Sequence, residues 1–376
     1  MTMPTDHPAR EDVEFLSHGT RCSAWLYRPT SGEARPPLVV MGHGLGGTRD
    51  LRLAAYAERF AAAGFAALVF DYRYSGSSDG EPRQLVDVRR QLEDWHAVLA
   101  FARTLEIDRD RIAIWGTSFG GGHVMRIGAE DQAVAAVVAQ CPFTDGPASF
   151  LARARHGFLS SGLLLFLAVV DAIGAKLGRR KALAVGMTGS SWMPAFMVAK
   201  DCVPGTSGLV QPGSVMSART SRLLARFPKL AAKFSPNLRL DDGRRSGRRA
   251  PSDGSATTYA GVGEGSTGQD PLWGVVTQPD GSRLHNALAA RLVLTLPFYR
   301  PGRDLKRLGT TPALVCACDL DTVAPPGPTV RYASDLANVR LIRYPYSHFG
   351  IYVDDAFEQA VGDQIAFLQE KLQPTG

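Results

Sequence analysis

Short apolar segments that favour strands alternate in this chain with longer segments that favour helices. A strand is predicted at 38–41 before a helix at 51–63, and another at 66–70 before a helix at 85–104. Consecutive strands joined through helices make right-handed crossovers, which set the strands parallel in one sheet with helices packed on it. The sequence therefore predicts an α/β fold with a mainly parallel central sheet, and ligands are expected beyond the carboxyl ends of its strands.

One turn in this pattern has the residues of a nucleophile elbow. The run G-T-S-F-G at 116–120 follows the strand-like segment 111–115 and opens onto helix-compatible sequence. In a G-x-S-x-G elbow the serine sits on a sharp strand-to-helix turn, and the glycines let neighbouring backbone approach where a side chain would clash. Ser118 is therefore the candidate nucleophile.

A glycine-rich loop, G-H-G-L-G-G at 42–47, follows the predicted strand at 38–41. Acyl-transfer chemistry builds negative charge on a substrate oxygen, and fixed backbone N–H donors aimed at that point contribute about 3 kcal/mol each. The backbone amides of Leu45 and Phe119 are the candidate donors of such an oxyanion hole. His43 lies in the same loop, where a histidine more often orders the turn than acts as a base.

Candidates for an acid and a base come late in the chain. The apolar run 311–317 has the length and composition of an interior parallel strand. Asp321 follows it and is favoured as the acid, because a short apolar stretch and proline come next, as in a turn that leaves a strand. Asp319 is the alternative acid. His348 lies in a loop after the next predicted strand, 340–344, and is the candidate base.

These residue types form a chemical unit. A serine hydroxyl is a poor nucleophile at neutral pH, so an imidazole must accept its proton and an acid must hold that imidazole in the right tautomer. Ser118, Asp321 and His348 occur in the order nucleophile, acid, histidine, which is typical of α/β-hydrolases and differs from the chymotrypsin and subtilisin orders. The sequence predicts a serine hydrolase with a Ser-Asp-His triad.

Four segments carry a resemblance to a known family: M-G-H-G-L-G-G-T-R-D at 41–50, V-F-D-Y-R at 69–73, W-G-T-S-F-G-G at 115–121 and Q-C-P-F-T-D at 140–145. The chain resembles the α/β-hydrolase superfamily, and more narrowly its dienelactone-hydrolase-like branch, which includes fungal polyketide transferases and related bacterial serine hydrolases. The resemblance covers roughly residues 10–150 and 270–372. It implies a triad at Ser118, Asp321 and His348. Dienelactone hydrolases proper use a cysteine nucleophile, so their substrate does not transfer to a chain with serine in the elbow.

The strand-helix alternation stops in the middle of the chain. We therefore expect residues 1–144 and 298–376 to form the α/β-hydrolase core, and residues 145–297 to form a helical cap or lid insertion. Residues 241–269 are rich in Gly, Ser, Arg and Asp. Such a composition cannot bury enough apolar surface to order itself, so a flexible cap loop is predicted there.

Composition narrows the possible partners. The 376 residues, 45% of them hydrophobic, can bury one α/β core with a cap, and the formal net charge of +6 is modest for this size. The most basic stretch, 244–249, sits among Asp, Gly, Ser and Pro and indicates a solvated linker. A small-molecule acyl ester or thioester is the expected partner, and a nucleic acid is not.

Three further features concern the environment of the protein. The first eight residues have no apolar segment of the kind found in secretory signals, and a cytoplasmic protein is expected. The longest apolar run, 163–170, is far short of the roughly 20 residues that span a bilayer, so we expect a buried cap helix and no membrane span. Five cysteines, an odd number without framework spacing, indicate reduced thiols. No metal site and no cofactor are predicted.

Three functions from different classes fit these residues. The leading one is hydrolysis of an ester or thioester through an acyl-serine intermediate, with water as the acceptor. The second is transfer of a polyketide-like acyl chain from a carrier to an alcohol, as the resemblance implies, with an acyl-carrier protein as a partner. The third is a non-catalytic ligand-binding protein on a hydrolase fold, and the complete triad counts against it. No residue reports the acyl-chain length, the acceptor, the oligomeric state or a peptidase activity.

Overall fold

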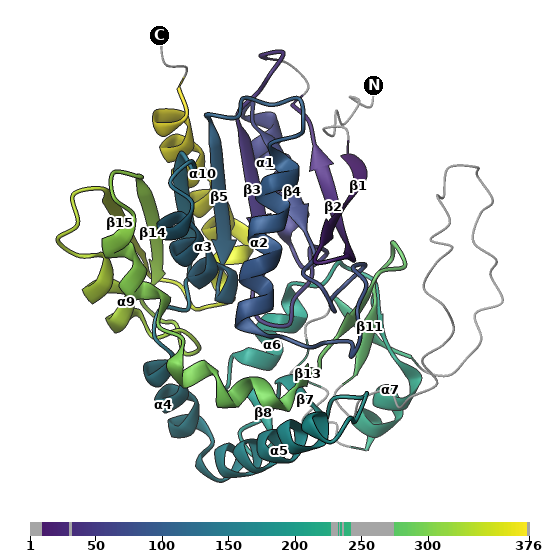
Figure 1. Cartoon of the computed structure of the whole chain (residues 1–376). Helices are drawn as coiled ribbons and strands as arrows, with labels where there is room; N and C mark the ends of the chain where they lie inside the picture. The colour runs from purple at the N-terminus through teal and green to yellow at the C-terminus, as the bar shows by residue number, and fades with distance from the viewer. Residues whose placement is uncertain are drawn as a thin grey trace, which may run out of the picture.

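An eight-stranded sheet runs through the computed structural model, which describes residues 10–29, 32–226, 232, 234, 237–241 and 274–373 (Figure 1). The strand order is β1-β2-β4-β3-β5-β6-β14-β15. The strands are β1 (Arg10–Ser17), β2 (Thr20–Tyr27), β3 (Leu38–Gly42), β4 (Ala66–Phe70), β5 (Ile112–Thr117), β6 (Ala136–Gln140), β14 (Ala313–Cys318) and β15 (Val339–Tyr344). Strand β2 is antiparallel to β1 and β4, and the remaining neighbours are parallel. The predicted mainly parallel sheet is confirmed.

Helices cover both faces of this sheet. Helices α1 (Leu53–Ala62) and α10 (Asp354–Lys371) pack on one face, and α2 (Val88–Ala102), α3 (Phe119–Glu130) and α9 (Pro326–Ala333) pack on the other. Alternate residues of β3 enter opposite cores: Val39 and Met41 join one, and Leu38 and Val40 join the other. Because both faces are covered, the interior parallel strands β3 and β4 are apolar along their whole length rather than at alternate positions.

Helix boundaries follow local chemistry. Helix α2 begins at Val88, later than predicted, because the Asp87 carboxylate accepts a hydrogen bond from the Arg90 amide at 3.0 Å and caps the helix. Helices α4 (Gly146–His156) and α5 (Phe158–Lys176) meet at Gly157. A Cβ atom at Gly157 would lie 2.4 Å from the Ser191 carbonyl oxygen, so only glycine fits that break.

Residues 145–297 are called the insert below, and the part of them that the structure describes leaves the large sheet and lies beneath it in Figure 1. The insert contains the expected helices and also two small sheets, of order β10-β9-β11-β12 and β13-β7-β8. Its helices are α4 (Gly146–His156), α5 (Phe158–Lys176), α6 (Cys202–Gly208) and α7 (Ala218–Ala225), followed by the short 3-10 helices η1 (Ala290–Leu294) and η2 (Leu296–Phe298). Its strands are β7 (Ala184–Thr188), β8 (Ala195–Met197), β9 (Ser214–Met216), β10 (Leu238–Leu240), β11 (Val275–Thr277), β12 (Arg283–His285) and β13 (Leu288–Ala289). Apart from Asp241, the predicted flexible loop at 241–269 and its basic stretch at 244–249 lie outside the described residues.

The prediction of a buried cap helix at 163–170 was wrong. Leu164 and Ala168 are buried in α5, whereas the apolar residues around them are exposed. The exposed members of that run are Leu163, Leu165, Phe166, Val169 and Val170. An apolar run favours a helix, but the neighbours that pack on a helix decide which of its faces is covered.

A buried ion pair fastens the end of β4 to α2. Arg73 follows β4, and its guanidinium pairs with Asp94, which also accepts the Arg73 amide at 3.0 Å. The hydroxyl of Ser17, at the end of β1, donates to the same carboxylate at 2.6 Å. Because Arg73 and Asp94 are both buried, each charge depends on the other for its stability.

Replacing one partner of this pair should destabilise the fold. We expect Asp94→Ala to lower the free energy of unfolding by about 3–5 kcal/mol, because the buried Arg73 guanidinium loses its buried partner and keeps only the part-exposed Glu93. Urea unfolding followed by circular dichroism measures the change. The matched control is Asp79→Ala, which removes an exposed pair with Arg21 and should cost less than about 1 kcal/mol. Equal losses in the two variants would contradict the assigned role of Asp94.

Candidate active site

Ser118 sits on a strained turn between β5 and α3. Its φ is 55° and its ψ is −117°, a backbone conformation that non-glycine residues rarely adopt. A Cβ atom at Gly116 would lie 2.2 Å from the Gly120 carbonyl oxygen, and one at Gly120 would lie 2.5 Å from the His43 carbonyl oxygen. The close approach that the elbow motif predicts is therefore present, and it needs glycine at both flanking positions.

Ser118, His348 and Asp321 form one hydrogen-bonded chain. His348 Nε2 lies 3.0 Å from Ser118 Oγ, and His348 Nδ1 lies 2.6 Å from Asp321 Oδ2. The other carboxylate oxygen of Asp321 accepts the amides of Val323 at 2.8 Å and Ala324 at 2.7 Å. The three residues follow β5, β14 and β15, parallel strands whose carboxyl ends share one edge of the sheet.

Asp319, the alternative acid, points to a different partner. Its carboxylate accepts a hydrogen bond from Arg343 Nε at 2.8 Å, and both side chains are substantially exposed. The backbone of Asp321 turns away from β14 with its amide bonded to the Cys318 carbonyl, which brings its carboxylate to His348. The fold thus brings Asp321, and not Asp319, to the imidazole.

The electrostatics of His348 favour its charged form. Burial is the largest single effect and opposes the imidazolium, but the adjacent Asp321 carboxylate together with Cys141 outweighs it, and the pKa of His348 rises to about 9. Because an ionised carboxylate only accepts hydrogen bonds, Nδ1 must carry the proton in the contact with Asp321. In the neutral ring this leaves Nε2 free to accept the proton of Ser118.

The loop at 42–47 passes directly against the elbow. A Cβ atom at Gly44 would lie 2.9 Å from the Ser118 Cβ atom, so the loop backbone touches the candidate nucleophile. Leu45 lies in this loop, and Phe119 begins α3, where the first amides of a helix have no acceptor within the helix. Phe119 thus follows Ser118 directly, and Leu45 follows Gly44, whose backbone approaches Ser118.

Asp71, at the end of β4, holds the segment that continues this loop. Its carboxylate accepts the amide of Arg49 at 2.9 Å and the amide of Ser77 at 3.1 Å. The guanidinium of Arg49 is buried and stacks over Trp25 at 4.4 Å. The members of this support lie in three separate segments of the chain, so no local pattern marks it.

Two buried histidines near the elbow have structural contacts. His43 Nδ1 lies 2.9 Å from the Gly44 carbonyl oxygen, and burial lowers the pKa of His43. His123 lies between the Tyr299 hydroxyl at 2.7 Å and the Gln91 side-chain oxygen at 2.9 Å. Burial lowers the pKa of His123 to about 3, so the ring is neutral at physiological pH, and it packs edge-on against Phe119.

The insert contacts the loops that carry the candidate acid and base. Thr322, next to Asp321, donates a hydrogen bond to Asp201 at 2.8 Å. A Cβ atom at Gly205 of α6 would lie 2.5 Å from the ring of Phe349, which follows His348. Sequence reasoning missed these contacts, because nothing near Asp201 or Gly205 in the chain marks them.

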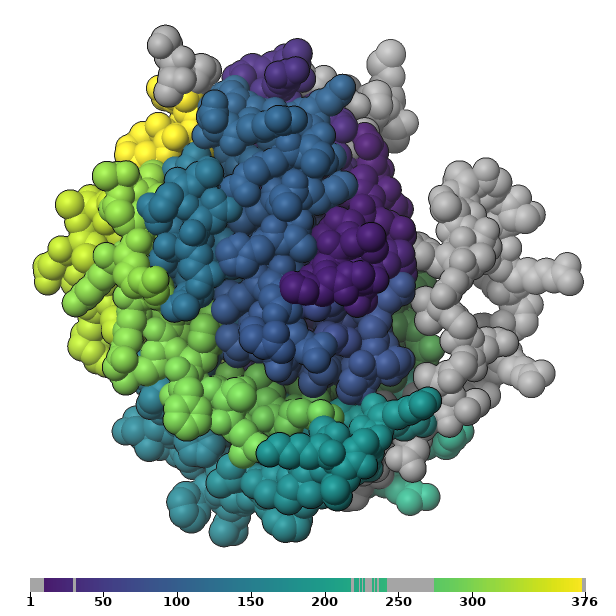
Figure 2. All heavy atoms as spheres, viewed as in Figure 1, coloured from purple at the N-terminus to yellow at the C-terminus, as the bar shows by residue number. Residues whose placement is uncertain are grey.

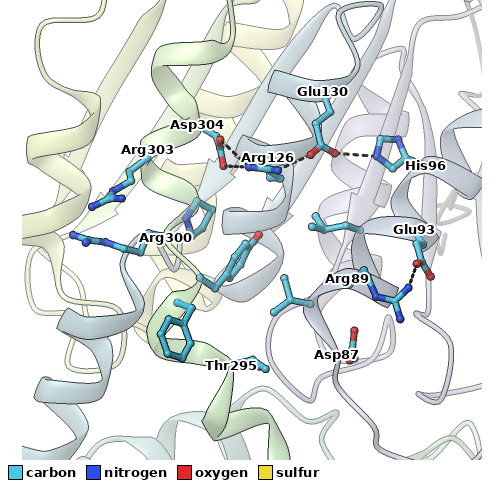
Figure 3. A pocket seen from close by; sticks show the side chains of 15 residues that line it. Asp87, Arg89, Glu93, His96, Arg126, Glu130, Thr295, Arg300, Arg303 and Asp304 are labelled. Atoms are coloured by element: carbon cyan, nitrogen blue, oxygen red, sulfur yellow. Dashed lines mark hydrogen bonds and ion pairs between the residues drawn. The ribbon is translucent and has the colours of Figure 1, made fainter.

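An open groove of about 730 Å³ lies elsewhere, between α2, α3 and the 3-10 helix η3 (Pro301–Arg307) (Figure 3). Its charged side chains largely pair with one another: Arg126 contacts Glu130 and Asp304, and Arg89 contacts Glu93. Ser118, His348 and Asp321 are not among the residues that line this groove. Across the described ranges, no group of three or more His, Cys, Asp or Glu could hold a metal ion.

Comparisons with known proteins agree with this architecture. A family model described as serine aminopeptidase, S33, matches residues 33–182. The quorum-quenching protein AidA of Acinetobacter baumannii is 41% identical over 359 residues, which are 95% of this chain and 94% of that protein. Polyketide transferase ATR5 of Stachybotrys chlorohalonatus is 39% identical over 138 residues, 36% of this chain and 46% of its own length.

A solved structure shows the same fold at low identity. The α/β hydrolase GrgF from Penicillium superposes with a TM-score of 0.63 at 19% identity, over 97% of this chain and 99% of its own. The sheet order, the elbow and a relative that matches along nearly its whole length lead to one conclusion. This chain belongs to the α/β-hydrolase superfamily, and polyketide transferases and thiohydrolases are among its relatives.

Proposed function

We propose that this protein is a serine hydrolase that cleaves an ester or thioester through an acyl-serine intermediate. The observation that carries the proposal is the hydrogen-bonded chain from Ser118 through His348 to Asp321, with contacts of 3.0 Å and 2.6 Å. Membership of the α/β-hydrolase superfamily supports it, since the order nucleophile, acid, histidine is the one used there.

In the proposed mechanism each residue has one role. Ser118 Oγ attacks the acyl carbon, and His348 Nε2 accepts the hydroxyl proton and returns it to the leaving group. Asp321 keeps the imidazole in the required tautomer and stabilises the imidazolium. The amides of Leu45 and Phe119 donate to the oxyanion. Water, activated by the same imidazole, then cleaves the acyl-enzyme.

We further propose that the insert is a cap over this site, on a core formed by residues 1–144 and 298–376. Two contacts support it: Asp201 with Thr322, and Gly46, where a Cβ atom would lie 2.8 Å from Leu288. A cytoplasmic location fits the cysteines, since all five are free thiols and buried.

Acyl transfer to an alcohol is the alternative function. It is favoured by the fungal relative named polyketide transferase, and it shares every step up to the acyl-enzyme. In that case an acyl-carrier protein would deliver the chain as a thioester. A non-catalytic binding protein is the least supported option, because a receptor has no need of the complete hydrogen-bonded chain.

The experiment that separates these functions is a substrate panel. It contains p-nitrophenyl esters of graded acyl length and acyl thioesters, each with and without an alcohol acceptor. Free acid as the main product supports hydrolysis. Ester product in preference to acid would support transfer, and no turnover with any substrate would support the binding protein.

Removing the hydroxyl of Ser118 should abolish turnover while the fold persists. We expect Ser118→Ala to lower kcat about a million-fold, to the level of binding and oxyanion contacts alone. It should also lose labelling by a fluorophosphonate probe. The matched control, Ser334→Ala on the exposed end of α9, should label like the wild type. Wild-type protein that resists the probe would refute the nucleophile assignment.

The two aspartates should differ sharply. We expect Asp321→Asn to lower kcat by about 10⁴-fold, because an amide favours the wrong tautomer of His348 and does not stabilise its imidazolium. Asp319→Asn should change kcat by less than about three-fold, since it removes only an exposed pair with Arg343. Steady-state hydrolysis of one good ester measures both. The reverse ranking would assign the acid to Asp319.

The raised pKa of His348 predicts a basic activity profile. The imidazole must be neutral to accept the serine proton, and in the free enzyme its pKa is raised to about 9. We therefore expect kcat/KM to rise with pH through neutrality and to level off only above the ordinary histidine value of about 6.5. A profile already flat at pH 6 would contradict the electrostatic effect of Asp321.

A further inference from the structure

Helix α5 presents an apolar face to solvent along its whole length. Its exposed apolar residues recur at intervals of three or four, so they form one stripe on the helix. They are Leu159, Leu163, Phe166, Val170, Ile173 and Leu177, with Phe158, Leu165 and Val169 beside them. Leu159 is 86% exposed, Phe166 63% and Leu177 82%. Figures 1 and 2 show α5 on the outside of the insert, at the edge of the molecule farthest from the sheet.

The opposite face of α5 is more polar and is fixed to the protein. Arg153 donates hydrogen bonds to Ser160 and Ser161 at the start of the helix. Asp171 is buried, pairs with Arg291 at 2.8 Å and accepts the Leu183 amide at 2.6 Å. A surface helix ordinarily buries its apolar stripe and exposes its polar one. Here the arrangement is reversed, and an exposed apolar surface of this kind marks an interaction site.

The attachment of the polar face to the rest of the protein restricts the orientations that α5 could adopt at a membrane. Over the described residues, α5 is the one helix whose length and composition would allow it to cross a bilayer. Only 28% of the residues in its apolar stretch are buried within the protein. If α5 crossed the bilayer, the ion pair between Asp171 and Arg291 would break and the Asp171 carboxylate would lie in the hydrocarbon region. The geometry therefore suits a helix that lies in the plane of the interface.

Cationic residues lie near the ends of the stripe, most of them at its C-terminal end. Asp171 is the only acidic residue between positions 146 and 200. Exposed basic side chains lie at both ends of α5, and within the described ranges none of them is in an ion pair: Arg155, Lys176, Arg179, Arg180 and Lys181. We call these five residues the cationic collar. A collar of this kind attracts anionic headgroups, and an interfacial helix commonly combines it with an apolar face.

Trp192 adds an interfacial anchor beside the start of the helix. It is 71% exposed, and the preceding residue, Ser191, accepts a hydrogen bond from Ser160 of α5 at 2.6 Å. Tryptophan is enriched where membranes meet water, because its ring is apolar and its N–H is polar. Trp192 is therefore an exposed aromatic residue near the start of α5, at the end opposite most of the collar.

We propose that the exposed face of α5, with Trp192 and the cationic collar, docks this protein onto the surface of an anionic lipid bilayer. Charge selects this occupant over a second copy of the chain. A second copy would bring further exposed cations and, from residues 146–200, no exposed carboxylate to neutralise them, because Asp171 is buried and paired with Arg291, whereas an anionic bilayer supplies the opposite charge. Anionic headgroups neutralise the collar while the stripe enters the acyl boundary.

Docking would orient the insert toward the lipid. Helix α5 packs on η1, and Leu288, just before η1, contacts Gly46 of the 42–47 loop. The proposed surface and the candidate site thus share the insert. The inference does not depend on the proposed hydrolase activity, because vesicle binding is measured without substrate.

Vesicle flotation tests the proposal with the full-length protein. Vesicles contain either phosphatidylcholine alone or equal parts of phosphatidylcholine and phosphatidylglycerol. Wild-type protein should float with the phosphatidylglycerol vesicles, and added salt should weaken this binding because it screens the collar. Protein that stays at the bottom of the gradient with both compositions would overturn the proposal.

Two sets of substitutions separate the contributions of the stripe and the collar. Leu159→Gln with Phe166→Gln and Ile173→Gln should weaken binding at least roughly ten-fold, since three large apolar side chains no longer enter the lipid. Arg179→Glu with Arg180→Glu and Lys181→Glu should abolish the preference for phosphatidylglycerol. The matched control, Leu16→Gln, removes an exposed apolar residue of β1 and should float like the wild type.

Two readouts keep the result unambiguous. Circular dichroism checks that each variant is folded, so that lost flotation reports the surface alone. Light scattering gives the oligomeric state of the wild type and of the apolar-stripe variant. A wild-type dimer that the stripe substitutions convert to a monomer, without vesicle binding, would show that a second copy covers this face and would refute the lipid assignment.

Discussion

Three backbone carbonyls pass so close to Gly116 and Gly120 that no side chain could stand at either position. They belong to Gly120, Gly42 and His43, so the elbow, the helix that follows it and the neighbouring glycine-rich loop are packed backbone to backbone. This contact forces Ser118 into its unusual conformation and sets the 42–47 loop beside it. The rest of the candidate site is arranged around that fixed point.

The sheet brings the other two members to this point. Strands β14 and β15 continue the parallel sheet beyond β5 and β6, so the loops after them open at the same edge as the elbow. Asp321 is fixed by two backbone amides before it contacts His348, which leaves one carboxylate oxygen directed at the imidazole. Burial of the pair excludes water from this contact and strengthens the field that the carboxylate exerts on the ring.

The insert differs from the core in how it distributes polar and apolar surface. The core buries apolar strands on both faces of the sheet, as parallel sheets require. In the insert, α5 directs Ser160, Ser161 and Asp171 inward, where Arg153 and Arg291 satisfy them, and directs its aliphatic side chains outward. Buried polar groups with complete hydrogen bonding hold the helix in place, so the apolar face is not needed for its attachment. That face is left available for a partner.

The sequence by itself determined the elements whose conformation depends on a few adjacent residues. The elbow, the loop at 42–47 and the strands around them could be predicted because glycine spacing and continuous apolar runs act locally. The choice between Asp321 and Asp319 rested on turn chemistry alone, and only the tertiary structure showed which carboxylate meets an imidazole 27 positions further along. The exposure of α5 was likewise decided by packing, because the same apolar run suits a buried helix and an interfacial one. Contacts between distant segments depend on the order of strands in the sheet and on which surfaces pack together. No single stretch of the sequence determines either of these.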